Sequence, residues 1–249
     1  MIFASTPHPL IGAHRGASGE APENTFAAFD LALTQGAELI ELDVHRTVDG
    51  YLVVQHDFSL HRTALQKGLV GDRTLEELRL CDVGAWRGEQ WAGQQIPTLD
   101  EVLDRYGAKV YLNVEIKVDR RPYPMIEALV ARAIHRRDLC DRVIVSSFNL
   151  ATIERLRQID PEIRTGLLSD DRPDEAVLQA HEVGMTAVHL EAELITAARL
   201  AHANRLGVGM LAWTVDDPVE MVRLTELGVD AIVSNFPAQL REVVLARRA

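Results

Sequence analysis

The alternation of strands and helices is clearest in residues 184–237, which read GMTAVHLEAELITAARLAHANRLGVGMLAWTVDDPVEMVRLTELGVDAIVSNFP. Short apolar, β-branched runs predict three strands, at 187–190, 207–214 and 231–234. Amphipathic stretches between them predict helices at 196–206 and 218–227. Glycines stand where these helices and the one before them are expected to end, at Gly184, Gly207 and Gly228. This order predicts right-handed βαβ units on a parallel sheet.

The same alternation extends through the rest of the chain. It predicts five more strands, at 9–13, 39–44, 110–116, 143–147 and 164–168. It also predicts helices at 24–35, 124–137, 150–158, 174–183 and from 237 onward. Eight such units close naturally into a (β/α)8 barrel, so we expect an α/β fold, a TIM barrel formed by a single domain over residues 1–249. An open doubly wound sheet is the alternative, but His14-Arg15-Gly16 follow the first strand in place of a G-x-G-x-x-G loop.

One connection is unusually long, because roughly 65 residues separate the second strand from the third. It begins with two alternating runs around Asp49-Gly50, which predict a β-hairpin. A short helix is expected over 74–80, and Thr98 with Glu101 three residues later predicts the capping box of the second barrel helix. We therefore place an insertion after strand two, at approximately 57–97, and expect it to roof the pocket.

Composition excludes several classes of function. The 249 residues include 26 Lys and Arg and 37 Asp and Glu, so the net charge is −11 and a nucleic-acid surface or a polybasic membrane patch is not expected. No apolar run approaches the roughly 20 residues of a membrane helix, and the N-terminus lacks the pattern of a signal peptide. Cys81 and Cys140 have no CxxC spacing, so we expect no disulfide framework and a cytoplasmic location.

Acidic and basic side chains gather where the first three predicted strands end. Glu41 and Asp43 are two residues apart, so they share one face of their strand, and Glu115 and Lys117 share a face of the next. Three carboxylates on neighbouring strands make an oxygen-rich site suited to Mg²⁺ or Ca²⁺, and Arg15 and Lys117 would suit a phosphate. The alternative is that the carboxylates only form ion pairs with Arg15, Arg46 and Lys117.

His14 and His56 flank this group and are the candidate proton carriers, because histidine titrates near neutral pH. Either histidine taken alone is more often structural. Trp213 and Phe148 follow later strands and are candidates for the wall of a substrate pocket, with core packing as the alternative. His189 and Glu191 are weaker pocket candidates, and Asn24 or Thr25 is expected to cap the first helix.

Residues 14–57 closely resemble the signature of glycerophosphodiester phosphodiesterases. They read HRGASGEAPENTFAAFDLALTQGAELIELDVHRTVDGYLVVQHD, and the likeness continues in LNVEIK (112–117), SSF (146–148), AWTV (212–215) and GVDAIVSNFP (228–237). The resemblance spans almost the whole chain in the same order. Any one of these motifs alone is weak, but their combination is highly specific.

The resemblance implies a (β/α)8 barrel that hydrolyses glycerophosphodiesters to sn-glycerol 3-phosphate and an alcohol with a divalent cation. Matched by motif, Glu41, Asp43 and Glu115 would hold the metal, and His14 and His56 would be the general acid and base. The same matching makes Arg15 and Lys117 phosphate ligands and Trp213 a contact for the glycerol or leaving-group side.

Two positions depart from the family's pattern. The family usually has Asn where this chain has Asp216, and a Thr-Asp pair where it has Ser234-Asn235. We expect hydrolysis to be unaffected and the preference for the alcohol to differ. The alternatives are a lysophospholipase D acting on lipid-tailed diesters, a lyase that releases a cyclic phosphate, and a barrel that binds phosphodiesters without turnover.

Overall fold

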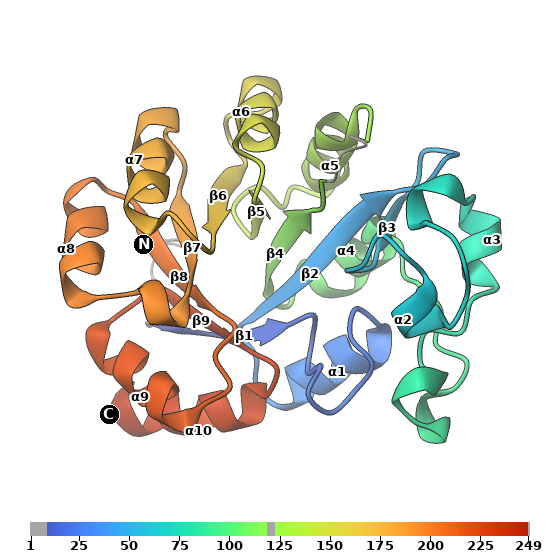
Figure 1. Ribbon diagram of the computed structural model, residues 1–249, viewed down its shortest axis with the longest axis horizontal. Coiled ribbons are helices and arrows are strands. Elements are labelled where there is room, and N and C mark those ends of the chain that lie inside the picture. Colours follow the sequence, from blue (N-terminus) through green and yellow to red (C-terminus); the bar gives the residue numbers. More distant parts are fainter. Residues whose placement is uncertain (1–8, 119–122, 249) are drawn as a thin grey trace.

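The computed structural model describes residues 9–118 and 123–248, and it confirms the predicted α/β barrel (Figure 1). The eight parallel strands are β1 (Leu10–His14), β2 (Leu39–Arg46), β4 (Tyr111–Ile116), β5 (Val143–Ser147), β6 (Arg164–Ser169), β7 (Ala187–Glu191), β8 (Gly209–Trp213) and β9 (Ala231–Ser234). Each strand pairs with its neighbour in parallel, and β1 pairs with both β2 and β9. These two pairings of β1 close the barrel.

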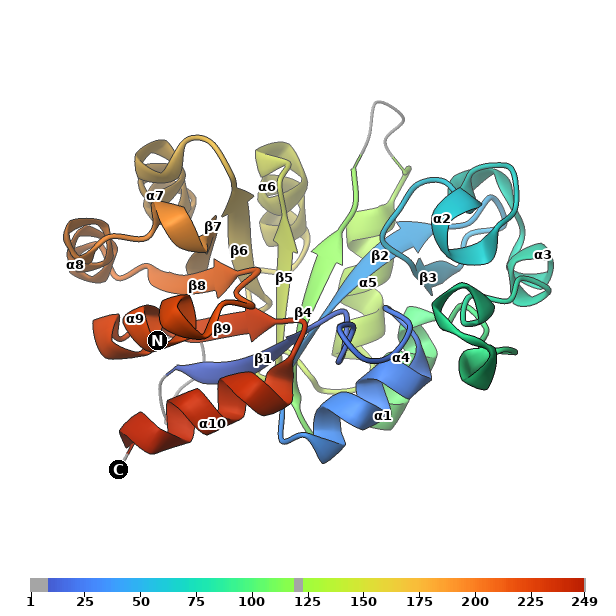
Figure 2. The same ribbon diagram turned by 60° about the horizontal axis from the view of Figure 1, so that its bottom comes forward.

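Helices between the strands form the outer layer, as Figure 2 shows for α1 and α10 beside β1 and β9. The longer helices are α1 (Phe26–Thr34), α4 (Leu99–Tyr106), α5 (Ile126–His135), α6 (Leu150–Ile159), α7 (Pro173–Val183), α8 (Ala197–Arg205), α9 (Pro218–Leu227) and α10 (Pro237–Arg248). Thr98 and Glu101 form the predicted capping box at the start of α4. Among the described residues, no helix has both the length and the apolarity to cross a membrane.

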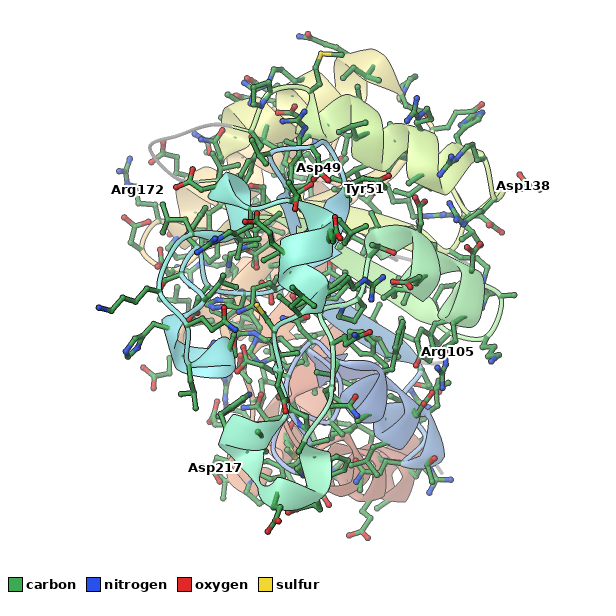
Figure 3. All side chains as sticks on the ribbon, turned by 90° about the vertical axis from the view of Figure 1, so that its right-hand side faces the viewer. Asp49, Tyr51, Arg105, Asp138, Arg172 and Asp217 are labelled. Carbon is green, nitrogen blue, oxygen red and sulfur yellow. The ribbon has the colours of Figure 1, made fainter. Side chains whose placement is uncertain are left out.

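The hairpin after β2 is present, with β3 (Leu52–Val54) antiparallel to β2 and Val44 opposite Val54. Two short helices follow, α2 (His61–Ala64) and α3 (Leu75–Arg79). Figure 3 labels Asp49 on the hairpin turn, where its carboxylate accepts hydrogen bonds from the backbone N–H of Leu75 at 3.2 Å. The hairpin thus anchors the start of α3.

The segment between β3 and α4 lies to one side of the barrel, at the right of Figure 1. It has a small apolar core of its own, formed by Val53, Leu60, Ala64, Val70, Leu78, Cys81, Val83 and Ile96. Because this core is built on the hairpin strand β3, the segment is held beside β2 rather than above the barrel axis. Trp86 and Arg87 of the segment line the cleft beside His14, so the segment walls one side of that cleft.

Alternation along each strand divides the interior from the helical layer. On β2, the even-numbered residues Ile40, Leu42 and Val44 pack against helices, while Leu39 faces the barrel axis. The axial apolar layer consists of Leu10, Leu39, Ile144, Ala187, Leu211, Ala231 and Val233. Glu41 and Asp43 share the face of Leu39 and lie nearer the C-terminal end of the strand. The barrel therefore has an apolar interior that ends in charged side chains.

Candidate active site

The three predicted metal ligands meet at the C-terminal ends of β2 and β4. Asp43 is directly opposite Glu115 in the strand register, and Glu41 is opposite Asn113. Glu41, Asp43 and Glu115 are all buried, and each offers a carboxylate oxygen within 4.8 Å of the others'. The spacing of two along each strand and the parallel register together produce this cluster.

Two cations contact the cluster. Lys117 Nζ lies 2.7 Å from Glu115 Oε1 and 3.3 Å from Asp43 Oδ1, and Arg15 Nε lies 3.3 Å from Asp43 Oδ2. The backbone N–H of Arg15 also donates to Glu41 Oε2 at 3.0 Å. Of the ion pairs that the alternative interpretation names, those with Arg15 and Lys117 are therefore present. Arg15 also pairs with Glu23 at 2.9 Å, so it is shared with a fourth carboxylate and the cluster keeps an excess of negative charge.

The pKa values reflect this excess. Burial, followed by repulsion from Asp43, raises the pKa of Glu115 to about 7 and that of Glu41 well above its usual range. Burial alone would also raise the pKa of Asp43, but Arg15 and Lys117 hold it well below its ordinary value. Glu41 and Glu115 therefore resist ionisation beside the ionised Asp43. A bound cation would stabilise their ionised forms.

Asn24 belongs to the site, although its sequence context identifies it only as a possible helix cap. Thr25 is the residue that caps α1, by accepting from the backbone N–H of Ala28. Asn24 is buried, has a positive φ of 57°, and donates from Nδ2 to Asp43 Oδ2 at 2.8 Å. Asparagine tolerates this left-handed backbone better than most residues, which allows its amide to hold the central carboxylate.

His14 ends β1 and is held through Asn235, which follows β9. His14 Nδ1 lies 2.8 Å from Asn235 Oδ1, and Asn235 Nδ2 donates to Asp216 Oδ2 at 2.5 Å. An ionised carboxylate only accepts, so Asp216 fixes the orientation of the Asn235 amide, and Asn235 Oδ1 must accept from His14 Nδ1–H. The neutral ring of His14 then has Nε2 as its acceptor, 3.9 Å from Glu41 Oε2. Burial and the neighbouring Arg15 lower the pKa of His14 to about 4.

His56 is held by a different chain of charges. Its Nδ1 lies 2.7 Å from Asp57 Oδ1, and Arg62 bonds both Asp57 and Glu23. Hydrogen bonds from Arg62, together with the His56 contact, lower the pKa of Asp57 to about 2 against the opposing effect of burial. Burial lowers the pKa of His56 itself. The partner of His56 is thus a carboxylate, whereas the partner of His14 is a neutral amide.

A pocket of about 140 Å³ opens between these groups and the barrel axis. Eight of the nine predicted site residues line it: His14, Arg15, Glu41, His56, Glu115, Lys117, Phe148 and Trp213. Asp43 is the ninth and lies in contact with Arg15 and Lys117. Phe148 and Trp213 meet edge to face, with ring centroids 5.6 Å apart, and form an aromatic wall.

His189 also lines this pocket, as the weaker prediction had it, and Glu191 is exposed outside it. Three buried nitrogens here have no hydrogen-bond partner within the described part of the chain: both ring nitrogens of His189 and the indole nitrogen of Trp213. A Cβ at Gly166 would collide with the His189 ring, so glycine at that position makes room for it. Buried polar atoms without partners are costly, which suits them to a polar ligand.

The model of the glycerophosphoryl diester phosphodiesterase family matches residues 14–239. A glycerophosphodiester phosphodiesterase from Caldanaerobacter subterraneus subsp. tengcongensis is 39% identical over 236 residues, covering 94% of this chain and 97% of that protein. One from Bacillus altitudinis is 35% identical, covering 91% and 94%.

Solved structures show the same likeness. An Oleispira antarctica phosphodiesterase in complex with the product sn-glycerol-3-phosphate superposes with a TM-score of 0.85 at 30% identity, covering 95% of this chain and 96% of that one. A glycerophosphodiester phosphodiesterase from Agrobacterium tumefaciens gives a TM-score of 0.84 at 28% identity, covering 94% and 100%.

Proposed function

The chain belongs to the glycerophosphoryl diester phosphodiesterase family and is a phosphoric diester hydrolase, and from this premise we propose that it converts glycerophosphodiesters to sn-glycerol 3-phosphate and an alcohol with a divalent cation and two histidines. The single observation that carries the proposal is the convergence of Glu41, Asp43 and Glu115 between His14 and His56. The structure of the Oleispira antarctica relative in complex with the product sn-glycerol-3-phosphate supports this choice of product.

The carboxylate cluster fits a divalent cation. Its donors are hard oxygens, as Mg²⁺ and Ca²⁺ prefer, and Asp43 Oδ1 is buried with no hydrogen bond beyond its ion pair with Lys117. We assign the metal to Glu41, Asp43 and Glu115. When bound, the cation would supply positive charge that stabilises the phosphoryl oxygens during displacement.

Arg15 and Lys117 would hold the phosphate; both line the pocket, and their charged ends lie at the carboxylate cluster. His14 and His56 would carry protons to and from the reacting oxygens. Asp57 offsets part of the burial that lowers the pKa of His56, so we assign the proton donor to His56 and the proton acceptor to His14, whose Nδ1 faces a neutral amide. The glycerol or leaving-group side would face Phe148 and Trp213, where His189 offers hydrogen bonds to hydroxyl groups.

A panel of diesters tests this function. Glycerophosphocholine, glycerophosphoethanolamine, glycerophosphoglycerol and glycerophosphoinositol should each be assayed for released sn-glycerol 3-phosphate. We expect turnover of at least one with metal present, and phosphorus NMR of the products should show the monoester. A cyclic phosphate as the end product would identify a lyase, and ligand binding without turnover would identify a binding protein.

The lysophospholipase D alternative draws on three exposed leucines of the segment beside the barrel, Leu65, Leu69 and Leu80. The cleft that adjoins His14 instead contains charged groups, including Glu23, Arg87 and Asp216. These charges favour a polar head group over an acyl chain. Faster hydrolysis of micellar lysophospholipid than of soluble glycerophosphodiesters would reverse this preference.

The proposal includes a reducing, cytoplasmic location. It is supported by the free cysteines Cys81 and Cys140, which form no disulfide in the described chain.

Asn235 is a positioning residue in this account. Asn235→Ala should lower kcat about 10–100-fold with KM near the wild-type value, because the Nδ1 tautomer of His14 loses its acceptor. The double variant Asp216→Asn/Asn235→Asp keeps an acceptor for His14 and an amide–carboxylate contact between the two side chains, so it should retain most of the activity. Nitrogen NMR of His14 reports the tautomer directly, and an unchanged tautomer in Asn235→Ala would show that Asn235 does not set it. Ser18→Ala is the matched control, since Ser18 Oγ donates to the same oxygen at 2.7 Å without touching the imidazole.

A further inference from the structure

Three side chains of metal-ligand type meet at the end of the barrel opposite the active site. His135 ends α5, Cys140 lies in the connection to β5, and Asp160 caps the end of α6. All three lie in segments that lead into strands, whereas the active-site residues lie where strands end. Figure 3 shows Asp138, from the same connection as Cys140, on the far side of the molecule from Arg172 and Asp217, which follow β6 and β8.

The distances between the donor atoms suit a tetrahedral metal. His135 Nδ1 lies 3.6 Å from Cys140 Sγ and 3.0 Å from Asp160 Oδ2, and the three ligand atoms all lie within 4.8 Å of one another. In a zinc site with a Zn–N bond of about 2.0 Å and a Zn–S bond of about 2.3 Å, tetrahedral angles place nitrogen and sulfur about 3.5 Å apart. The nitrogen–sulfur edge is thus already formed, and the nitrogen–oxygen edge needs only a few tenths of an ångström of opening.

The surroundings of Cys140 attract a cation. Four acids lie close enough to act on the Cys140 sulfur: Asp138, Asp141, Asp160 and Glu162. These carboxylates create a negative potential at the sulfur, and a bound cation would offset that potential and favour the thiolate. His135 is 61% exposed at its side chain and Asp160 only 13%, so a metal has an open path to a partly enclosed group of ligands.

We propose that His135, Cys140 and Asp160 form a second metal site, specific for Zn²⁺ or a similar borderline cation, with its fourth position taken by water or a neighbouring carboxylate. Thiolate and imidazole select zinc over Mg²⁺ and Ca²⁺, whereas the oxygen cluster at Glu41 selects the harder ions. The site joins the connection before β5 to the end of α6. It would stabilise the base of the barrel by binding the folded state, and it takes no part in hydrolysis.

Cobalt provides the test, because only a thiolate ligand gives Co²⁺ a near-ultraviolet sulfur-to-metal charge-transfer band. Metal-free full-length protein titrated with Co²⁺ should develop this band and lose it when Zn²⁺ is added. Cys140→Ser should abolish the band. Cys81→Ser is the matched control and should leave the band intact, because Cys81 is buried in the apolar core beside the barrel. A wild-type protein without the band, or a band that survives in Cys140→Ser, would overturn the proposal.

His135→Ala gives an independent test that keeps the thiol. We expect its affinity for Zn²⁺ to fall at least about 10-fold, since loss of a direct ligand should cost no less than loss of an outer-shell partner. Zn²⁺ should also raise the melting temperature of the wild type more than that of Cys140→Ser or His135→Ala. Hydrolysis measured with Mg²⁺ should be the same in all three proteins. Equal zinc affinity in His135→Ala and wild type would contradict the assignment, and this outcome is separate from any failure of the proposed hydrolysis.

Discussion

His14→Ala and His56→Ala should each lower kcat at least about 100-fold while the protein remains folded. A positioned acid or base contributes typically about 10²–10⁴-fold, and alanine removes the proton-carrying nitrogen altogether. Both rings line the inner pocket, and each is held at Nδ1 so that Nε2 remains for the reacting atoms. Neither ring belongs to an apolar core cluster, so the loss should be kinetic rather than structural.

The measurement is steady-state release of sn-glycerol 3-phosphate with circular dichroism to confirm folding. His61→Ala is the matched control, because His61 is exposed at the start of α2 and does not line the inner pocket. Turnover near the wild-type level in either His14→Ala or His56→Ala would remove that histidine from the chemistry. An equal loss in His61→Ala would show that the effect is not specific to the site.

Glu41→Gln and Glu115→Gln should each lower activity about 1,000-fold at a fixed Mg²⁺ concentration. Both changes keep the shape of the side chain and remove one of the three charges that we assign to the metal. A metal contributes several kcal/mol of charge stabilisation, and about 1.4 kcal/mol corresponds to tenfold in rate. Because burial and repulsion already raise the pKa of both carboxyls, the apoprotein should not be destabilised by either change.

Isothermal titration with Mg²⁺ or Ca²⁺ separates this explanation from a direct effect on the chemistry. The two variants should bind the cation more weakly and recover part of their activity at high metal concentration. Glu154→Gln on the outer surface of α6 is the control and should behave as wild type. Unchanged metal affinity in both variants would place the metal elsewhere.

Most of the barrel could be predicted from local pattern. The strands over 143–147 and 231–234 and the helix over 218–227 have the predicted bounds, because each is a short periodic run between clear start and stop signals. The capping box at Thr98 and the hairpin at Asp49-Gly50 are equally local. The carboxylate cluster could also be predicted, because residues two apart along parallel strands point to the same side of the sheet, here the barrel interior.

The remaining contacts depend on segments far apart in the chain. Asn235 meets His14 across 221 residues, only because β9 pairs with β1 when the barrel closes. The sequence marks Asp216 and Asn235 as departures from the family's pattern and assigns their effect to alcohol preference. Asn235 contacts His14, and Asp216 contacts Asn235, so we also expect an effect on the acid–base step.

Contacts made by segments without a periodic sequence pattern are equally hard to predict. Arg62 links Glu23 with Asp57 from the segment beside the barrel, where no repeat predicts which side chain faces the cleft. Asn24 has a left-handed backbone conformation and binds Asp43, whereas its sequence context indicates only a possible helix cap. His135 contacts Asp160 and Cys140 at the base of the barrel, and no periodic pattern relates the segments that carry these three residues.

Removal and return of the metal tests the central proposal most directly. The wild-type protein should be treated exhaustively with chelator, freed of it, and assayed for release of sn-glycerol 3-phosphate from its best diester before and after addition of Mg²⁺ or Ca²⁺. We predict that hydrolysis is lost on chelation and restored by one of these ions, because Glu41, Asp43 and Glu115 form a site that needs a cation. Full activity in the chelated protein, or an activity that neither ion restores, would contradict this account.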